Sequence, residues 1–221
     1  MPSIKRYAKA LKDYFTKGEA GDAAFGEIEF YSIGANPDLI AQLQDFVGYY
    51  PSIDLEQLSQ LPKGTLGYEY AQHMKQHNIQ PLEISPDLKE EADRNPFALR
   101  YTVTHDLFHI LLGFDTSYAG EMGVFGFTVG QNYSKMLKLA ELPVMLIICL
   151  IAPKQIKKTL ANRNRGKALG KQAKCLLVYP FEDNWSRPIK DIRAELGLFL
   201  EDNDEKRNAI AEFQTPGRVT A

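Results

Sequence analysis

The 221-residue sequence predicts a mainly helical, all-α protein that folds as a single domain over residues 1–221. Apolar residues recur every three or four positions between short stretches rich in proline, glycine and asparagine, which is typical of amphipathic helices. Alternation of apolar and polar residues is scarce, and the best strand candidate is the segment CLLVY. A chain of this length can bury a substantial core, and it contains no internal repeat of solenoid length.

Turn-forming residues separate the segments that we expect to be helical. The N-terminal segment MPSIKRYAKALKDYF places Ile4, Tyr7 and Leu11 on one face, and GTLGYEYAQHMKQH places Leu66 and Tyr70 four residues apart. The expected helices lie near residues 4–15, 22–32, 37–47, 66–78, 97–112, 117–138, 141–151, 154–173 and 188–196, and a polar tail follows from about residue 201.

The net charge, the cysteines and the N-terminal segment argue against several classes of protein. The net charge of −2 gives no general attraction to nucleic acid, so we expect no nucleic-acid partner. Cys149 and Cys175 form no C-x-x-C motif and sit beside apolar residues, which argues against a disulfide framework or a zinc knuckle. The N-terminus lacks the apolar core of a signal peptide, and Asp13 argues against a transit peptide, so we expect a cytoplasmic protein.

The segment THDLFHILLGFDTSYAGEMG places two of the four histidines and an acid among leucines and phenylalanines. Each residue of a helix turns the chain by about 100°, so His105, His109 and Asp106 share one arc of the surface. Gly113 is a natural helix stop, and the short connection after it would bring Glu121 back toward the same site. Two imidazoles with one or two carboxylates are a credible ligand set for a divalent metal, because buried charge is costly without a cation.

We therefore expect one metal ion, held by His105, Asp106, His109 and Glu121. Zinc is the expected ion, iron or manganese would also suit the mixed nitrogen and oxygen ligands, and magnesium suits them less well because it prefers oxygen. In the same site, Asp106 or Glu121 is the expected catalytic group that moves a proton.

A second histidine pair, His73 and His77, is also four residues apart. Its neighbours are Gln, Lys and Asn, and no acid accompanies it in the pattern, so we expect these histidines to lie exposed on a helix face.

Four glycines fall on one arc of the next expected helix, roughly opposite Glu121. Each glycine inside a helix costs about 1 kcal/mol relative to alanine, which indicates that something approaches this backbone closely. Packing of another helix explains them, and a smooth wall for a long hydrophobic ligand is the alternative. They are Gly120, Gly123, Gly126 and Gly130.

The most apolar run, LPVMLIICLIA, is followed directly by a basic stretch without any acidic residue. The run has about half of the roughly 20 residues needed to cross a bilayer, so we expect a buried or monotopic helix and not a span. The basic stretch is either a solvated helix face or a contact for anionic lipid headgroups or a phosphate, and the whole run predicts peripheral membrane attachment. Its basic residues are Lys154, Lys157, Lys158, Arg163, Arg165, Lys167, Lys171 and Lys174.

With H-D-x-x-H, eleven intervening residues and E matched at His105, Asp106, His109 and Glu121, the chain resembles the family of coenzyme Q (ubiquinone) biosynthesis protein four. The likeness extends to LPKGTLGYEYAQHM before the motif and to YPFEDNWSRPIKDIRAELGL near the end. The resemblance implies a helical protein that works at a membrane face on polyprenylated quinone precursors, with the motif residues as metal ligands. Without a mitochondrial presequence, a bacterial-type member at the inner membrane is expected.

Two functions from different classes follow from this resemblance. The first is a metal-dependent lyase that decarboxylates carbon 1 of a polyprenylated hydroxybenzoate, with or without hydroxylation. The second is a non-catalytic scaffold that binds an isoprenoid lipid and organises other quinone-biosynthesis enzymes. A metalloprotease or phosphohydrolase is the weakest alternative. Asp106 stands where a protease has Glu, and the sequence offers no strong candidates for the further His and Asp ligands that a phosphohydrolase needs on distant helices. The sequence leaves monomer and homodimer both open.

Overall fold

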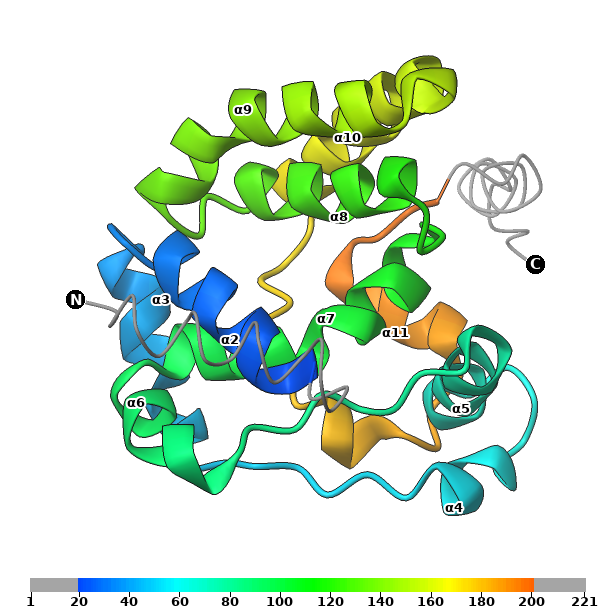
Figure 1. The fold of residues 1–221 in the computed structure, drawn as a ribbon. Coiled ribbons are helices and arrows are strands. Elements are labelled where there is room, and N and C mark those ends of the chain that lie inside the picture. The colour runs from blue at the N-terminus through cyan, green and yellow to red at the C-terminus, as the bar shows by residue number, and fades with distance from the viewer. Residues whose placement is uncertain (1–19, 201–221) are drawn as a thin grey trace, which may run out of the picture.

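The computed structural model describes residues 20–200, and these residues form helices and connecting segments without a strand (Figure 1). The all-α prediction is confirmed. The expected helix at 4–15 and the polar tail from 201 lie outside the described residues. In chain order the elements are α2 (Ala20–Tyr31), α3 (Pro37–Gln42), η1 (Leu43–Phe46), α4 (Leu55–Ser59), α5 (Leu66–His77), η2 (Pro86–Leu88), α6 (Lys89–Arg94), α7 (Pro96–Leu112), α8 (Tyr118–Gly130), α9 (Lys135–Ile151), η3 (Pro153–Gln155), α10 (Ile156–Gln172), η4 (Phe181–Asn184) and α11 (Ile189–Leu196).

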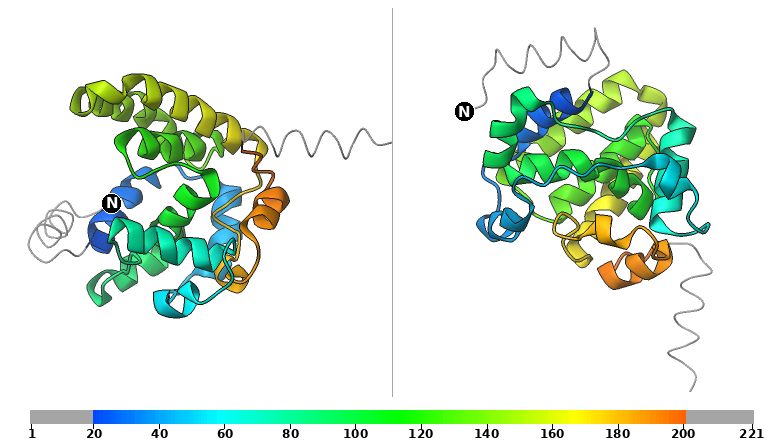
Figure 2. Two further views of the ribbon diagram at one scale, coloured as in Figure 1. Left: turned by 90° about the vertical axis from the view of Figure 1, so that its right-hand side faces the viewer. Right: turned by 90° about the horizontal axis from the view of Figure 1, so that it is seen from below.

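The helices form two tiers. In Figure 1 and in the left view of Figure 2, α8, α9 and α10 make one tier, and α7 lies below α8 among the remaining helices. Helix α7 is the centre of the fold, because it is buried almost all round and packs against α2, α5, α6 and α8. The Asn95 side chain caps its N-terminus by accepting a hydrogen bond from Ala98 N, and Gly113 ends it in a left-handed conformation with φ 64°.

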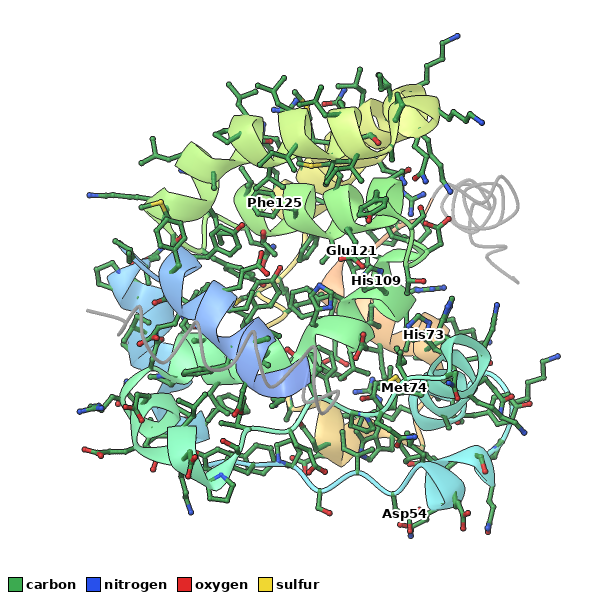
Figure 3. All side chains as sticks on the ribbon, viewed as in Figure 1. Asp54, His73, Met74, His109, Glu121 and Phe125 are labelled. Carbon is green, nitrogen blue, oxygen red and sulfur yellow. The ribbon has the colours of Figure 1, made fainter. Side chains whose placement is uncertain are left out.

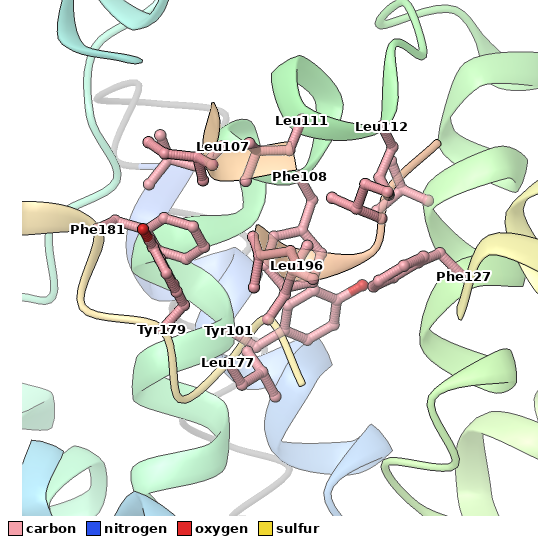
Figure 4. Packing of buried hydrophobic residues seen from close by; sticks show 14 of the residues in the cluster. Tyr101, Leu107, Phe108, Leu111, Leu112, Phe127, Leu177, Tyr179, Phe181 and Leu196 are labelled. Carbon is pink, nitrogen blue, oxygen red and sulfur yellow. The ribbon is translucent and has the colours of Figure 1, made fainter. Parts of the chain in front are cut away.

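The core joins residues from α3 to the segment after α11. Phe108 of α7 meets Phe127 of α8 edge to face, with ring centroids 5.9 Å apart and planes at 80° (Figure 4). Leu177, Phe181 and Leu196 from the C-terminal third of the chain pack into the same cluster. The two motif-bearing helices are therefore fixed to each other by buried aromatic and aliphatic side chains.

The glycines of α8 pack against other parts of the chain, Gly126 and Gly130 against α10, and the alternative of a smooth wall for a lipid is wrong. A β-carbon on Gly126 would lie 2.5 Å from the carbonyl oxygen of Arg163, and one on Gly130 would lie 2.5 Å from that of Lys167. Helix α10 contributes Gly166 and Gly170, whose β-carbons would meet the α8 backbone at 2.0 and 2.3 Å. The backbones of α8 and α10 thus touch, which holds the opposite face of α8, with Glu121, toward α7.

Two helix boundaries differ from the prediction. We expected a helix to end near residue 138 and another to begin near 141, before Pro143, but α9 runs through Pro143. The carbonyl that loses its partner to this proline belongs to Leu139, an exposed residue, so water can hydrate it. The real break lies at residues 131–134, where Asn132 has φ 57° and Ser134 caps α9 by accepting from Leu137 N. The short helices α4 and α6 were not predicted.

The strand candidate CLLVY is not a strand. Its carbonyl groups at Leu177 and Tyr179 accept hydrogen bonds from the guanidinium of Arg100, which is 1% exposed and also forms an ion pair with Glu182 at 2.6 Å. A buried guanidinium that binds carbonyls and a carboxylate satisfies irregular backbone without a sheet.

The apolar run of α9 is not a buried helix. Its outer face exposes Leu146 and Leu150, the latter at 82%, together with Leu139, Leu142, Ile147 and Ile151. Within residues 20–200 no single helix is long and apolar enough to cross a bilayer; Lys135–Ile151 and Pro153–Gln172 pass that test only as a pair, and they meet at a bend of 114°. In the basic stretch, Arg163 and Lys167 bind the buried carboxylate of Glu141, so part of this charge stabilises the fold.

Candidate metal centre

The short connection after Gly113 brings Glu121 to the two motif histidines. Ser117 caps α8 by accepting a hydrogen bond from Gly120 N, and this places Glu121 in the first turns of the helix. One carboxylate oxygen of Glu121 lies 3.3 Å from His109 Nε2, and the other lies 3.5 Å from His105 Nε2. Figure 3 shows Glu121 on α8 next to His109 on α7. The three ligand atoms lie within 4.8 Å of one another, so the expected return of the chain is confirmed.

The surroundings of His109 set its tautomer. Its Nδ1 lies 3.3 Å from the carbonyl oxygen of Phe114 and 3.2 Å from that of Asp115, and because carbonyls only accept, Nδ1 must carry the proton. In the neutral ring Nε2 then has a lone pair, and this buried atom has no hydrogen-bond donor although it faces a carboxylate oxygen. Two electron-rich atoms in contact require a proton or a cation between them.

His105 has similar neighbours, but its Nδ1 contact is an ion-pair distance and not a hydrogen bond. Its Nδ1 faces Asp106 Oδ1 at 3.9 Å, and its Nε2 faces Glu121. Burial alone would lower the pKa of His105, but the carboxylates of Asp106 and Glu121 outweigh it and raise the pKa. Both imidazoles therefore direct Nε2 to one carboxylate and Nδ1 to oxygen atoms, as metal-bound histidines do.

The spacing of these atoms fits a metal ion. Two ligand atoms that are each roughly 2.0–2.1 Å from a tetrahedral ion lie about 3.3–3.4 Å apart, and each histidine Nε2 lies near this distance from one of the two Glu121 oxygens, a different oxygen for each histidine. A set of two imidazoles and one carboxylate is typical of catalytic zinc sites, which keep a further position open. The residues present therefore fit a divalent transition metal.

Asp106 is not part of the group of possible ligands formed by His105, His109 and Glu121. Its carboxylate approaches His105 from the Nδ1 side, opposite to the side that faces Glu121. Burial by itself would raise the pKa of Asp106, yet the neighbouring histidines His105, His109 and His73 lower it, so the group is held as a carboxylate. Asp106 thus lies on the side from which a carboxylate would orient His105 when a metal ion is bound to Nε2.

The ligand group borders a pocket of about 440 Å³ between α2, α7, α8 and α9. His105 and Glu121 form part of its wall, whereas the rest of the wall is mainly apolar and aromatic. Sequence reasoning did not find the pocket, because its walls come from four helices whose relative positions depend on tertiary packing. Its described lining residues are Ala24, Glu27, Ile28, Tyr31, Leu82, Tyr101, Thr102, His105, Tyr118, Glu121, Val124, Phe125, Val144 and Ile148.

The expectation for the second histidine pair is wrong. His73 and His77 are half-buried, and the ring of His73 stacks on that of His109, with centroids 6.3 Å apart and planes at 20°. A signal was present in the sequence: at 100° per residue, both histidines fall on the arc of Leu66 and Tyr70, which are buried. The polar neighbours of the pair concealed this position.

Comparison with known proteins agrees with the motif. The model of the family described as "Coenzyme Q (ubiquinone) biosynthesis protein Coq4" matches residues 50–202. The chain belongs to the Coq4 family. The mitochondrial COQ4 homologue of Rattus norvegicus is 28% identical over 154 residues, and that of Danio rerio is 30% identical over 156; both matches cover 66% of this chain. They cover 55% and 54% of those relatives, so the chain spans about half the length of the curated Coq4 proteins it matches.

The Coq4 fold also has a counterpart among solved structures. A crystal structure from Nostoc punctiforme, of a protein assigned to ubiquinone biosynthesis, superposes with a TM-score of 0.61. The superposition covers 89% of this chain and 97% of that one at 22% sequence identity, so it supports the fold.

Proposed function

We propose that this Coq4 protein is a divalent-metal-dependent enzyme of ubiquinone or related prenylquinone biosynthesis. It would remove the carboxylate from carbon 1 of a polyprenylated hydroxybenzoate, with or without installing a hydroxyl group there. The observation that carries the proposal is the His105, His109 and Glu121 group at the edge of an apolar pocket. Family membership supports the pathway, and other enzymes of quinone biosynthesis are the proposed partners.

The pocket suits a ring with an apolar tail. Its volume lies within the range of about 300–1,000 Å³ that is usual for small-molecule sites. Polar atoms gather where His105 and Glu121 reach the wall, while Ile28, Val124 and Phe125 supply apolar surface. A ring carboxylate would therefore lie at the ligand group and the first part of a prenyl chain along the apolar wall.

The charge of the pocket makes binding of an anionic substrate depend on a bound metal ion. Among the described lining residues Glu27 and Glu121 are acidic, and none is lysine or arginine. An anionic benzoate would meet mostly negative charge there unless the ligand group holds a cation. A prenylated hydroxybenzoate should therefore bind the metal-loaded protein far better than the metal-free one, whereas a prenylated phenol without the carboxylate should bind both forms similarly.

The chain's own residues would orient the ring and supply a proton. In simple decarboxylation the bond between carbon 1 and the carboxylate breaks, the electron pair stays on the ring, and carbon 1 takes a proton. Glu121 is 41% exposed and reaches the pocket, so its carboxylate is the better placed to pass a proton from water to carbon 1, and Asp106 would act through His105. When bound, a divalent metal would supply Lewis-acid stabilisation of negative charge on the substrate oxygens. Hydroxylation would also require an oxidant of the dioxygen class.

Release of carbon dioxide from a carboxyl-labelled prenylated hydroxybenzoate tests the proposal. Metal-loaded wild type should release labelled carbon dioxide, and His109→Ala should not. Lys75→Ala, an exposed change on α5, is the matched control and should behave as wild type. Equal, background release by wild type and His109→Ala, while both still bind the lipid, would contradict the enzyme proposal.

A lipid-binding scaffold is the second candidate function. The apolar character of the pocket favours it, because binding and presenting an isoprenoid intermediate needs no chemistry. In that case the metal would only join α7 to α8. The same labelled substrate separates the two functions, since a scaffold binds it without turnover.

We also propose peripheral membrane contact through the exposed apolar face of α9. Leu146 and Leu150 lie on this face, whereas Val144 and Ile148 of the same helix line the pocket. Lys154 and Lys157 are exposed just beyond its end, where they could meet anionic headgroups. Helix α9 would then separate a lipid surface from the site that accepts a lipid-tailed substrate.

Flotation with anionic vesicles tests the contact. Wild type should float, flotation should weaken as salt rises, and Leu150→Glu should float less at every salt concentration. Gln57→Glu, an exposed change on α4, is the control for added negative charge. Equal flotation of wild type and Leu150→Glu would contradict this assignment.

A further inference from the structure

Helix α5 places the ring of His73 next to that of His109, and the ring of His77 next to that of His73. The rings of His73 and His77 are 4.7 Å apart, and the ring of His73 is the next one to His109 at 6.3 Å. The ring of His105 is a further neighbour of His109, with centroids 4.9 Å apart. All four histidines of the chain therefore form one continuous cluster, although only two belong to the ligand group.

His73 restrains the face of the His109 ring. The planes of the two rings differ by only 20°, and the distance between centroids is within the range of about 4.5–7 Å for aromatic pairs. His109 is 1% exposed and its Nδ1 is held at its edge by two carbonyl groups. The two carbonyl contacts at the edge and the near-parallel ring of His73 beside it together restrict how far His109 can turn its Nε2.

His77 restrains the connection that holds the His109 edge. Its Nδ1 shares a hydrogen bond of 3.2 Å with the Thr116 hydroxyl. Thr116 directly follows Asp115, whose carbonyl accepts from His109 Nδ1. Lys158 of α10 forms an ion pair with the Asp115 side chain, so the connection is attached to α5 on one side and to α10 on the other.

We propose that His73 and His77 are positioning residues for the metal ligand His109, His73 through ring stacking and His77 through Thr116. The inference rests on the proposed metal centre. Partners that orient a ligand typically change metal affinity by roughly 10–100-fold, and we expect about 10-fold for each contact. The pair itself has no carboxylate near enough to complete a group of three ligands among the described residues.

Cobalt(II) provides the test, because its visible absorption reports the ligand geometry as well as occupancy. The full chain should bind one Co²⁺ in wild type. His73→Ala and His77→Phe should bind it about 10-fold more weakly and with a changed spectrum. His73→Phe retains a flat ring and His77→Asn retains a polar atom for Thr116, so both should recover most of the affinity. Gln76→Phe, at an exposed position of α5, is the matched control for His77→Phe.

A mutant cycle and a metal-free measurement complete the test. Thr116→Val should resemble His77→Phe, and the double variant should lose little more than either. In metal-free protein, ¹⁵N shifts of the His109 ring should show the proton on Nδ1 in wild type and a mixture of tautomers in His77→Phe. Unchanged affinity, spectrum and tautomer in both His73→Ala and His77→Phe would overturn the inference.

Two other outcomes separate this inference from the metal centre itself. If wild type bound two Co²⁺ ions and His73→Ala lost one of them, the pair would be a metal site of its own and not a positioning device. If wild type bound no metal ion, the metal centre would be wrong and the inference would fall with it.

Discussion

The two histidine pairs of this protein have the same spacing and different surroundings. His105 and His109 lie one turn apart on α7, and His73 and His77 lie one turn apart on α5. The α7 pair faces Glu121 at 3.5 and 3.3 Å, whereas His77 of the α5 pair meets the Thr116 hydroxyl. In both pairs the spacing places two imidazoles on one side of a helix. Whether a pair can bind a metal ion then depends on the neighbouring group, a carboxylate for the α7 pair and a hydroxyl for His77 of the α5 pair.

The difference shows that the carboxylate and the tautomers, and not the spacing, define the candidate metal centre. In the α7 pair both Nε2 atoms face a carboxylate and both Nδ1 atoms face oxygens. In the α5 pair a neutral hydroxyl group can satisfy an imidazole without any ion.

Removal of a ligand should have the largest effect. His109→Ala should weaken binding of Zn²⁺ or Co²⁺ by more than about 100-fold, because even outer partners are worth roughly 10–100-fold. His77→Ala should weaken it by only about 10-fold. Competition with a chelator of known affinity measures both variants, and unfolding temperatures of the metal-free proteins control for folding. Equal losses of metal affinity in the two variants would contradict the different roles of the two histidine pairs.

Asp106→Asn should have an intermediate effect with a distinct pH profile. A metal ion binds neutral imidazole, so protonation of His105 competes with metal binding. Because the pKa of His105 is raised, this competition begins at a higher pH than for an ordinary histidine. Without the Asp106 charge this pKa falls, so the pH of half-maximal binding should move down. The affinity at high pH should also fall about 10-fold, because His105 loses its orienting carboxylate. A profile that moves up, or does not move, would contradict this role of Asp106.

A carboxylate added to the α5 pair should have the smallest effect. Thr116→Asp places an acid beside His77, so this variant should gain a second and weaker Co²⁺ site while the first remains. Thr116→Asn has the same shape without the charge and should not gain it. Isothermal titration gives the stoichiometry. No second ion in Thr116→Asp would show that a nearby carboxylate is insufficient.

Periodicity and caps predicted much of this fold. Asn95, Gly113 and Ser117 bound the two motif helices close to where the sequence suggested, because caps are local hydrogen-bonding features. Pro143 misled the prediction, since a proline on an exposed face can be accommodated inside a long helix. The irregular segment bound to Arg100 was not predictable, because its partner lies about 80 residues earlier in the chain.

In the candidate site, too, some features could be predicted from the sequence and others could not. Helical geometry brought His105, His109 and Glu121 together, because all three lie within two helices joined by a short connection. Asp106 shares their arc, but its carboxylate approaches the other side of His105, a difference that depends on side-chain direction. His73 and the pocket walls come from distant segments, so only the folded chain reveals the contact of His73 with His109 and the shape of the pocket.

Anomalous X-ray diffraction from crystals of the metal-loaded protein, recorded at the absorption edge of the bound ion, tests the central claim most directly. We predict one strong peak within bonding distance of His105 Nε2, His109 Nε2 and a Glu121 carboxylate oxygen, with its open side toward the pocket. A peak between His73 and His77, or none at the α7 and α8 junction, would contradict the account.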